Sequence, residues 1–145
     1  MVTVYLAKDG SYRIVPYHQT TMGVGIAGYA VDVLDSPADE ELGARVLAAL
    51  DTAGRVVPHP HSQEEWSAHT RSFVRAMGYR SHRQLMSANS AVVVSRQGDA
   101  VLVLPTDNLG TRGGYSHRSD RSTVVVARPS AVGKAIRAAE ASALT

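Results

Sequence analysis

The chain has 145 residues, of which 44% are hydrophobic and 19% are charged. This composition excludes a disordered protein, and the length predicts a single domain over residues 1–145. Cysteine is absent, which excludes disulfides, thiol catalysis and thiolate metal sites. Fifteen Lys and Arg against thirteen Asp and Glu leave a net charge of +2. A charge this small does not require nucleic acid as a partner.

The N-terminal residues Met1–Tyr5 lack the basic region and the long apolar stretch of a secretory signal. The longest apolar runs, such as Ala100–Pro105, are far shorter than the ~20 residues that span a bilayer. We therefore expect a cytoplasmic protein with no membrane partner.

The first third of the chain predicts three strands. Turn-forming residues divide the β-prone segment Val2–Tyr17 into two halves, which predicts a hairpin. The run Tyr29–Leu34 predicts a third strand with Tyr29, Val31 and Val33 on one face, because side chains alternate along a strand.

Two helices follow. Ser36 is placed to cap the first helix and Pro37 suits its first position, and the helix is expected to run to about Asp51. Ser62 is predicted to cap the second helix, which is expected to end near Gly78.

The remaining residues predict a short helical turn at 81–88, a hairpin at 91–105, a polar loop at Asn108–Ser119 and a strand at Ser122–Ala127. Ser130 is predicted to cap a final helix that runs to about Ser142. These elements predict an α+β fold, with a mostly antiparallel sheet of about five to six strands and three to four helices packed on it.

The first and last helices each carry an apolar residue followed by glycine near their start, at Leu42-Gly43 and Val132-Gly133. Glycine costs a helix about 1 kcal/mol relative to alanine. Its use at equivalent positions predicts that both helices pack closely against the sheet.

Two short motifs have the residue spacing of cofactor or metal sites, but their surroundings do not fit such sites. Gly23–Gly28 matches the spacing of a dinucleotide-binding loop, but a strand-like run follows where that loop requires a helix. We interpret it as a bend or bulge. His59 and His61 have chelate spacing, but prolines flank His59 and no third ligand is near. A solvated loop is favoured, and we expect neither cofactor nor metal.

The segment Asp107–Asp120 is the most unusual part of the sequence, and it leaves several interpretations open. Its arginines and tyrosine could grip phosphates and stack a base, or form a protein-binding surface, in which Tyr and Arg are enriched. It could also be a flexible polar loop. A fourth possibility is a hydrolase in which His117 acts as base and Asp107 or Asp120 orients it.

A resemblance favours protein binding. The helix segment Glu41–Leu50 resembles the early helix of the contact-dependent growth inhibition immunity proteins of bacteria. The later hairpin with Leu104-Pro105-Thr106, the loop, the strand and the helix segment Val132–Ala138 are similar to that family as well. The order of elements matches over roughly residues 29–140.

The resemblance implies a cytoplasmic immunity protein, not an enzyme, that binds and neutralises the C-terminal toxin domain of a partner, often a nuclease. It leaves the oligomeric state open. The alternative is a nucleic-acid-binding module that uses Arg112, Tyr115, Arg118 and Arg121. Two surfaces are candidates for toxin contact, the acidic start of the first helix and the 107–120 segment. Their residues are Asp39, Glu40, Glu41, Asp107, Arg112, Tyr115, His117, Arg118 and Asp120.

Overall fold

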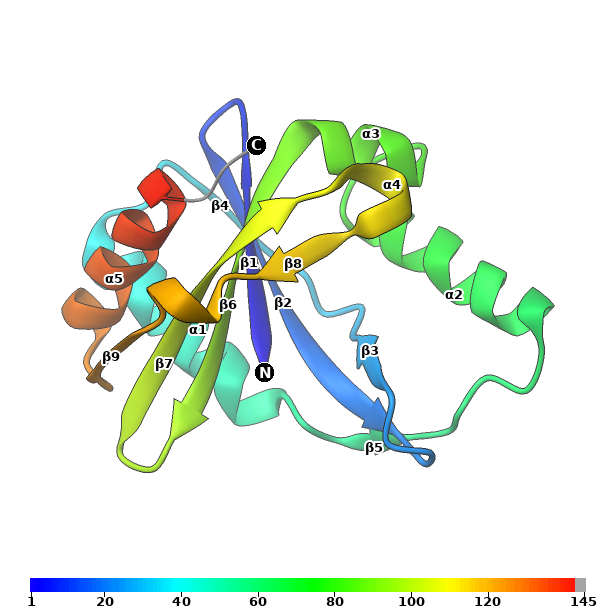
Figure 1. The fold of residues 1–145 in the computed structure, drawn as a ribbon, viewed down its shortest axis with the longest axis horizontal. Coiled ribbons are helices and arrows are strands. Elements are labelled where there is room, and N and C mark those ends of the chain that lie inside the picture. Colours follow the sequence, from blue (N-terminus) through cyan, green and yellow to red (C-terminus); the bar gives the residue numbers. More distant parts are fainter. Residues whose placement is uncertain (143–145) are drawn as a thin grey trace.

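Four long strands form the centre of the sheet in this computed structural model, which describes residues 1–142. They lie in the order β2 (Ser11–Thr20), β1 (Val2–Ala7), β6 (Asn89–Gln97) and β7 (Ala100–Asn108), each antiparallel to its neighbour (Figure 1). Both predicted hairpins are confirmed. The turn of the β6–β7 hairpin contains Gly98, whose φ of 63° lies in the left-handed region that suits glycine.

Short strands extend both sides of this centre. β3 (Gly25–Ala27), β4 (Asp32–Asp35) and β5 (Val56–Val57) pair with β2, whereas β8 (Tyr115–His117) and β9 (Thr123–Val126) pair with β7. The α+β prediction is confirmed. Within residues 1–142 the sheet has nine strands, more than predicted. Strands of two to four residues carry too little hydrophobic alternation to be recognised from sequence.

Helices cover both faces of the sheet. α1 (Asp39–Thr52) and α5 (Pro129–Ser142) lie together on one face. α2 (Gln63–Ala76) and α3 (His82–Ala88) lie on the other (Figure 1). α4 (Gly110–Gly113) is a single turn that follows β7.

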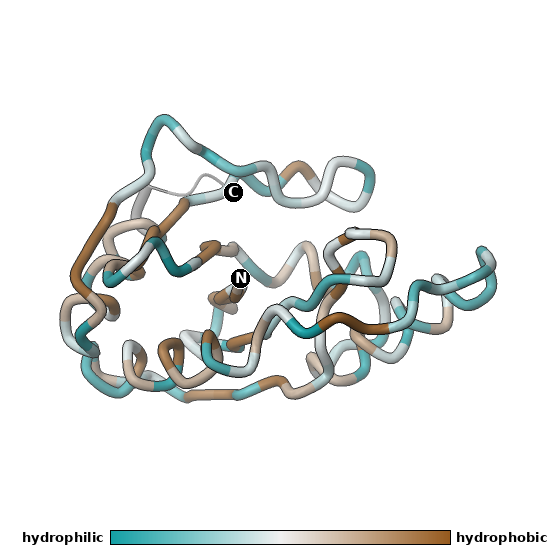
Figure 2. The backbone as a smooth tube through the Cα atoms, turned by 90° about the horizontal axis from the view of Figure 1, so that it is seen from below, coloured by the Kyte–Doolittle hydropathy of each residue, from teal (hydrophilic) through white to brown (hydrophobic). Residues whose placement is uncertain are grey.

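The sheet therefore separates two hydrophobic cores. Val4 of β1 packs into the larger core beneath α1 and α5, with Ile14, Leu42 and Ile136. Tyr5, the next residue, packs into the smaller core beneath α2 and α3. Because neighbouring side chains of β1 are buried on opposite faces, this strand lies at the centre of the molecule. Figure 2 shows mainly hydrophilic residues along the peripheral helix α2.

The third strand is shorter than predicted. β4 begins only at Asp32, and Leu34 is the residue that points into the larger core. Val33 remains 54% exposed and Tyr29 52% exposed. Tyr29 instead shares a hydrogen bond of 2.5 Å between its hydroxyl and Nδ1 of His69 on α2.

Two of the three predicted serine caps are also wrong. α1 begins at Asp39 and no side chain caps it, while Ser36 lies before it with a left-handed φ of 45°. Ser130 lies inside the first turn of α5, behind Pro129. The predicted cap at Ser62 is confirmed, since its hydroxyl accepts a hydrogen bond of 3.1 Å from the backbone N–H of Glu65.

A side chain of α5 binds the start of α1. The guanidinium of Arg137 donates hydrogen bonds to the backbone carbonyl of Pro37 and to the carboxylate of Asp39. These residues are about a hundred positions apart in sequence, so local patterns could not reveal the contact. The arrangement ties α1 to α5.

The two helix glycines do allow close packing, but each packs against the other helix and not, as predicted, against the sheet. A Cβ added at Gly43 would lie 1.7 Å from the carbonyl oxygen of Pro129, at the start of α5. A Cβ added at Gly133 would lie 1.9 Å from the carbonyl oxygen of Asp39, at the start of α1. Each glycine therefore allows the two helix backbones to touch each other, not the sheet.

Glu140 lies beside this helix pair in a half-buried position. The hydroxyl of Tyr12 donates a hydrogen bond of 2.8 Å to Glu140 Oε2, and Arg137 Nη1 donates one of 3.0 Å to the same hydroxyl. Burial raises the pKa of Glu140 to about 7, although its contacts to Tyr12 and Arg137 oppose this. The folded protein therefore keeps a proton on Glu140 at pH values where the unfolded chain has lost it.

This difference predicts a pH dependence of stability. Between the usual glutamate pKa, near 4.5, and about 7, the native state binds more protons than the unfolded state, so the free energy of unfolding falls as pH rises. Glu140→Gln removes this fall and raises stability at pH 8 by about 1–2 kcal/mol, after allowance for partial solvent exposure. Urea unfolding at pH 5 and pH 8 measures the change. An exposed control, Glu64→Gln, keeps the wild-type slope, and an unchanged slope in Glu140→Gln would contradict the assignment.

Candidate functional site

The segment that follows β7 is ordered secondary structure, so the predicted polar loop at Asn108–Ser119 is wrong. β7 continues to Asn108, α4 makes one turn, and β8 then runs back antiparallel, with Asn108 opposite Tyr115. A 3₁₀ turn, η1 (Ser119–Arg121), completes the segment. It is thus a β-hairpin with a helical turn at its tip.

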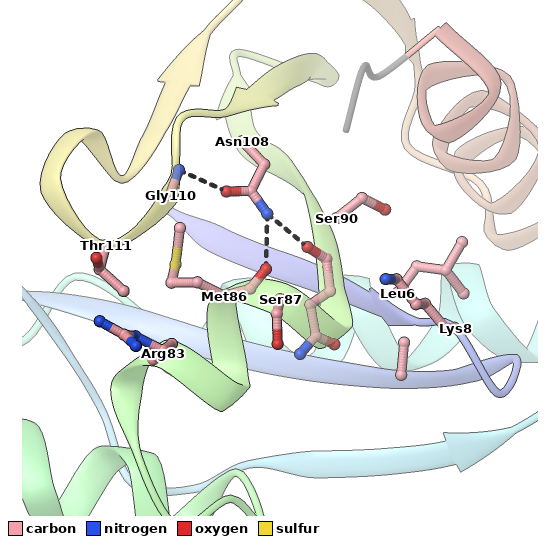
Figure 3. Close-up of a pocket in the computed structure, with 11 residues that line it drawn as sticks. Leu6, Lys8, Arg83, Met86, Ser87, Ser90, Asn108, Gly110 and Thr111 are labelled. Carbon is pink, nitrogen blue, oxygen red and sulfur yellow. Dashed lines mark hydrogen bonds between the residues drawn. The ribbon is translucent and has the colours of Figure 1, made fainter.

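The side chain of Asn108 holds this tip in place. Its Oδ1 accepts a hydrogen bond of 2.9 Å from the backbone N–H of Gly110, at the start of α4. Its Nδ2 donates to the backbone carbonyls of Met86, at 2.7 Å, and of Asn89, at 3.1 Å (Figure 3). One amide therefore fastens α4 to the junction between α3 and β6.

Three of the predicted contact residues meet at the base of this hairpin. Arg118 donates to both carboxylate oxygens of Asp107, at 3.1 and 3.3 Å, and to both of Asp120, at 3.1 Å each. The hydrogen bonds to Asp120 and Asp107 raise the pKa of Arg118 above its usual value. The positive charge of Arg118 is therefore compensated within the protein.

The other predicted residues of the hairpin differ in exposure. Tyr115 turns inward, and its ring lies edge-on to Tyr5 with 5.7 Å between ring centroids. Its hydroxyl donates to the carbonyl of Asn89 at 3.1 Å, and burial raises its pKa. Arg112 and His117 are exposed. Tyr115 is therefore part of the smaller core's edge, and the other two residues face solvent.

The predicted acidic surface lies on the other face of the sheet. Asp39, Glu40 and Glu41 form the first turn of α1, which packs with α5 over the larger core. Asp39 is held by Arg137, while Glu40 and Glu41 are exposed. The structure thus does not bring the two predicted contact surfaces together.

A pocket of about 530 Å³ adjoins α4 and was not anticipated from the sequence. Its walls come from the end of β1, from α3, from the start of β6 and from the tip of the hairpin (Figure 3). Lys8 and Arg83 give it two cations, and Asn108 and Thr111 give it polar groups. Since these residues come from four separate segments, no local motif could signal the pocket. It forms one recessed surface with the exposed side of α4.

The glycine and histidine motifs have ordinary structural roles. Gly23 lies in the turn after β2, and the short strand β3 follows it, as the bend interpretation predicted. Nδ1 of His59 lies 2.8 Å from the hydroxyl of Thr20, and the His59 ring lies edge-on to Trp66. Across residues 1–142 no three His, Asp or Glu side chains are placed to hold a metal ion.

The fold and surface define a class: an α+β protein with a curled antiparallel sheet between two helix pairs and a polar recess at the tip of a hairpin. Within the described residues no helix has the length and apolarity to cross a bilayer. No family model matches the sequence, and no curated protein does.

Solved structures share this fold at low sequence identity. One is a protein of unknown function from Neisseria meningitidis, with a TM-score of 0.80 and 13% identity over 98% of this chain and 93% of that chain. Another belongs to the CdiA-CT/CdiI toxin and immunity complex from Yersinia pseudotuberculosis, with a TM-score of 0.73 and 13% identity over 98% of this chain and 95% of that one. At this identity the likeness shows the fold.

Proposed function

We propose that this chain is an immunity protein. It binds and neutralises the C-terminal toxin domain, a nuclease, of a contact-dependent growth inhibition effector in the cytoplasm, and has no chemistry of its own. The observation that carries the proposal is the similarity to a chain of a toxin and immunity complex, which extends over nearly the whole of both chains. The resemblance of Glu41–Leu50 and Val132–Ala138 to immunity proteins supports it independently.

The proposed toxin-binding surface is the recess together with the exposed side of the hairpin. Asn108 holds α4 rigidly, and the Asp107–Arg118–Asp120 cluster holds the base of the hairpin. A preformed surface loses little conformational entropy on binding, which favours high affinity. Arg112 and His117 project to solvent there and are the side chains placed to reach a partner. Glu40 and Glu41 remain a second candidate on the opposite face.

The geometry gives less support to nucleic-acid binding by residues 107–121. Stacking a base requires a free aromatic face, and the ring of Tyr115 is packed against Tyr5. Arg118 already donates to two carboxylates. The hydrolase arrangement is weakened by the same cluster, because both carboxylates that could orient His117 accept from Arg118.

The direct test is binding to the toxin domain encoded immediately upstream of this gene. We expect a one-to-one complex by titration calorimetry, and inhibition of the toxin in a growth assay. Arg112→Glu at the surface of α4 should weaken binding by about tenfold or more, because charge reversal within an interface introduces repulsion. Arg128→Glu, an exposed reversal just before α5, should bind as wild type does. Absence of any complex with that toxin would refute the immunity function.

A further inference from the structure

Two groups among the arginines of this protein have contrasting surroundings. Members of the first group pair with aspartates, namely Arg45 with Asp32, Arg96 with Asp51, Arg118 with Asp107 and Asp120, and Arg137 with Asp39. Members of the second group, Arg71, Arg75 and Arg80, line a second pocket of about 430 Å³ between the end of α2 and the start of α3. We call this pocket the arginine groove. No acidic residue lines it, and within residues 1–142 its three arginines form no ion pair with a carboxylate.

These arginines place like charges close together. Arg71 and Arg75 are four residues apart on α2 and share one side of the helix, where like charges repel. The acidic residues of α2, Glu64 and Glu65, lie in its first turn and are not three or four residues from either arginine. Arg80 and His82 add further basic groups from the opposite wall. No acidic side chain lines the groove to relieve this repulsion.

The groove is also rigid. Nε of Arg13 donates a hydrogen bond of 2.7 Å to the carbonyl of Met77, and its guanidinium lies 5.1 Å from the ring centroid of Tyr79. The backbone N–H of Arg80 donates to Gln84 Oε1 at 2.9 Å. The backbone that carries the groove is therefore fixed on both sides before any ligand arrives.

We propose that the arginine groove binds the carboxylates of an acidic segment of a protein partner. Arginine forks match carboxylates in geometry and charge, and within residues 1–142 no carboxylate forms an ion pair with these three. An acidic segment fits better than a nucleic acid. One ring face of Tyr79, the groove's aromatic side chain, is covered by Arg13 and is closed to a stacking base. The groove is separate from the hairpin surface, and the proposal stands apart from the immunity function.

The test uses the full chain and a fluorescein-labelled peptide of eight glutamates, with binding followed by fluorescence anisotropy at low and physiological salt. The wild-type protein is expected to bind the peptide. Arg71→Gln/Arg75→Gln should weaken binding by about fivefold or more. The matched control, Arg55→Gln/Arg128→Gln, removes the same charge from exposed positions outside the groove and should stay within about twofold of wild type.

A stability measurement separates a binding role from a structural one. Because Gln forms helices well and the repulsion is relieved, Arg71→Gln/Arg75→Gln should unfold at a temperature equal to or above that of wild type. Arg80→Gln, in the turn between the helices, provides a second variant with the same expected loss of peptide binding. Equal weakening in the groove and control variants would overturn the proposal. So would tighter binding of a labelled octauridine RNA than of the peptide, which would assign the groove to nucleic acid.

Discussion

Gly43→Ala is expected to lower the free energy of unfolding by about 3 kcal/mol or more. In an isolated helix the same change would stabilise by about 1 kcal/mol, because alanine is the better helix former. Here the new methyl group would lie 1.7 Å from the carbonyl oxygen of Pro129, which is a backbone atom and cannot rotate away. The helices α1 and α5 must therefore separate, which loosens the larger core between them and the sheet. Urea denaturation measures the loss.

Two further substitutions test the same contact between the helices. Gly133→Ala should cost about as much, since its methyl group would meet the carbonyl of Asp39 in the reciprocal contact. Gly25→Ala is the control, because a Cβ there meets nothing within 4 Å and the backbone is not left-handed. It should change stability by no more than about 0.5 kcal/mol. Equal stability of Gly43→Ala and Gly25→Ala would show that the two helices do not touch through their backbones.

Asn108→Asp is expected to cost about 2–3 kcal/mol at pH 7, the second largest effect. The substitution replaces an amide nitrogen that donates to two carbonyls, those of Met86 and Asn89, with a carboxylate oxygen that repels both. The cost should shrink below about pH 4, where the new carboxyl is protonated and can donate again. Denaturation at pH 3.5 and pH 7, each compared with wild type at the same pH, measures this difference.

The functional consequence of Asn108→Asp follows from the position of α4. With the tip of the hairpin released, the proposed toxin-binding surface is no longer preformed, so affinity for the toxin should fall along with stability. Gln97→Glu makes the same chemical change at an exposed position of β6 and should alter neither property. If Asn108→Asp bound the toxin as tightly as wild type does, the surface would have to lie elsewhere, with Glu40 and Glu41 as the remaining candidate.

The elements that could be predicted are those that form because of residues close to them in the sequence. The hairpin turn at Gly98 needs a left-handed residue, and the cap at Ser62 needs only the N–H three positions on. Both signals lie within a few residues of the structure they produce. The same holds for the α+β class, because apolar runs of strand and helix length alternate along the chain.

The predictions that were wrong concern segments whose structure depends on residues far away in the sequence. Ser36 was expected to cap α1, but Arg137, a hundred residues later, binds the entry to that helix. The polar segment after Asn108 contains no hydrophobic periodicity, and it is ordered by an amide that reaches carbonyls of Met86 and Asn89. The charge compensation of Arg118 depends likewise on Asp107, on the strand opposite.

Local patterns along the chain were enough to predict the composition class, the central hairpins, the major helices and the unusual polar residues at 107–120. They could not predict which of these residues are exposed, which charges are compensated and where the surface is recessed. The physical reason is that exposure and pairing depend on neighbours brought together by the fold. Tyr115 became part of a core edge and Arg71, Arg75 and Arg80 came to share a groove because of packing between elements, which no spacing along the chain records.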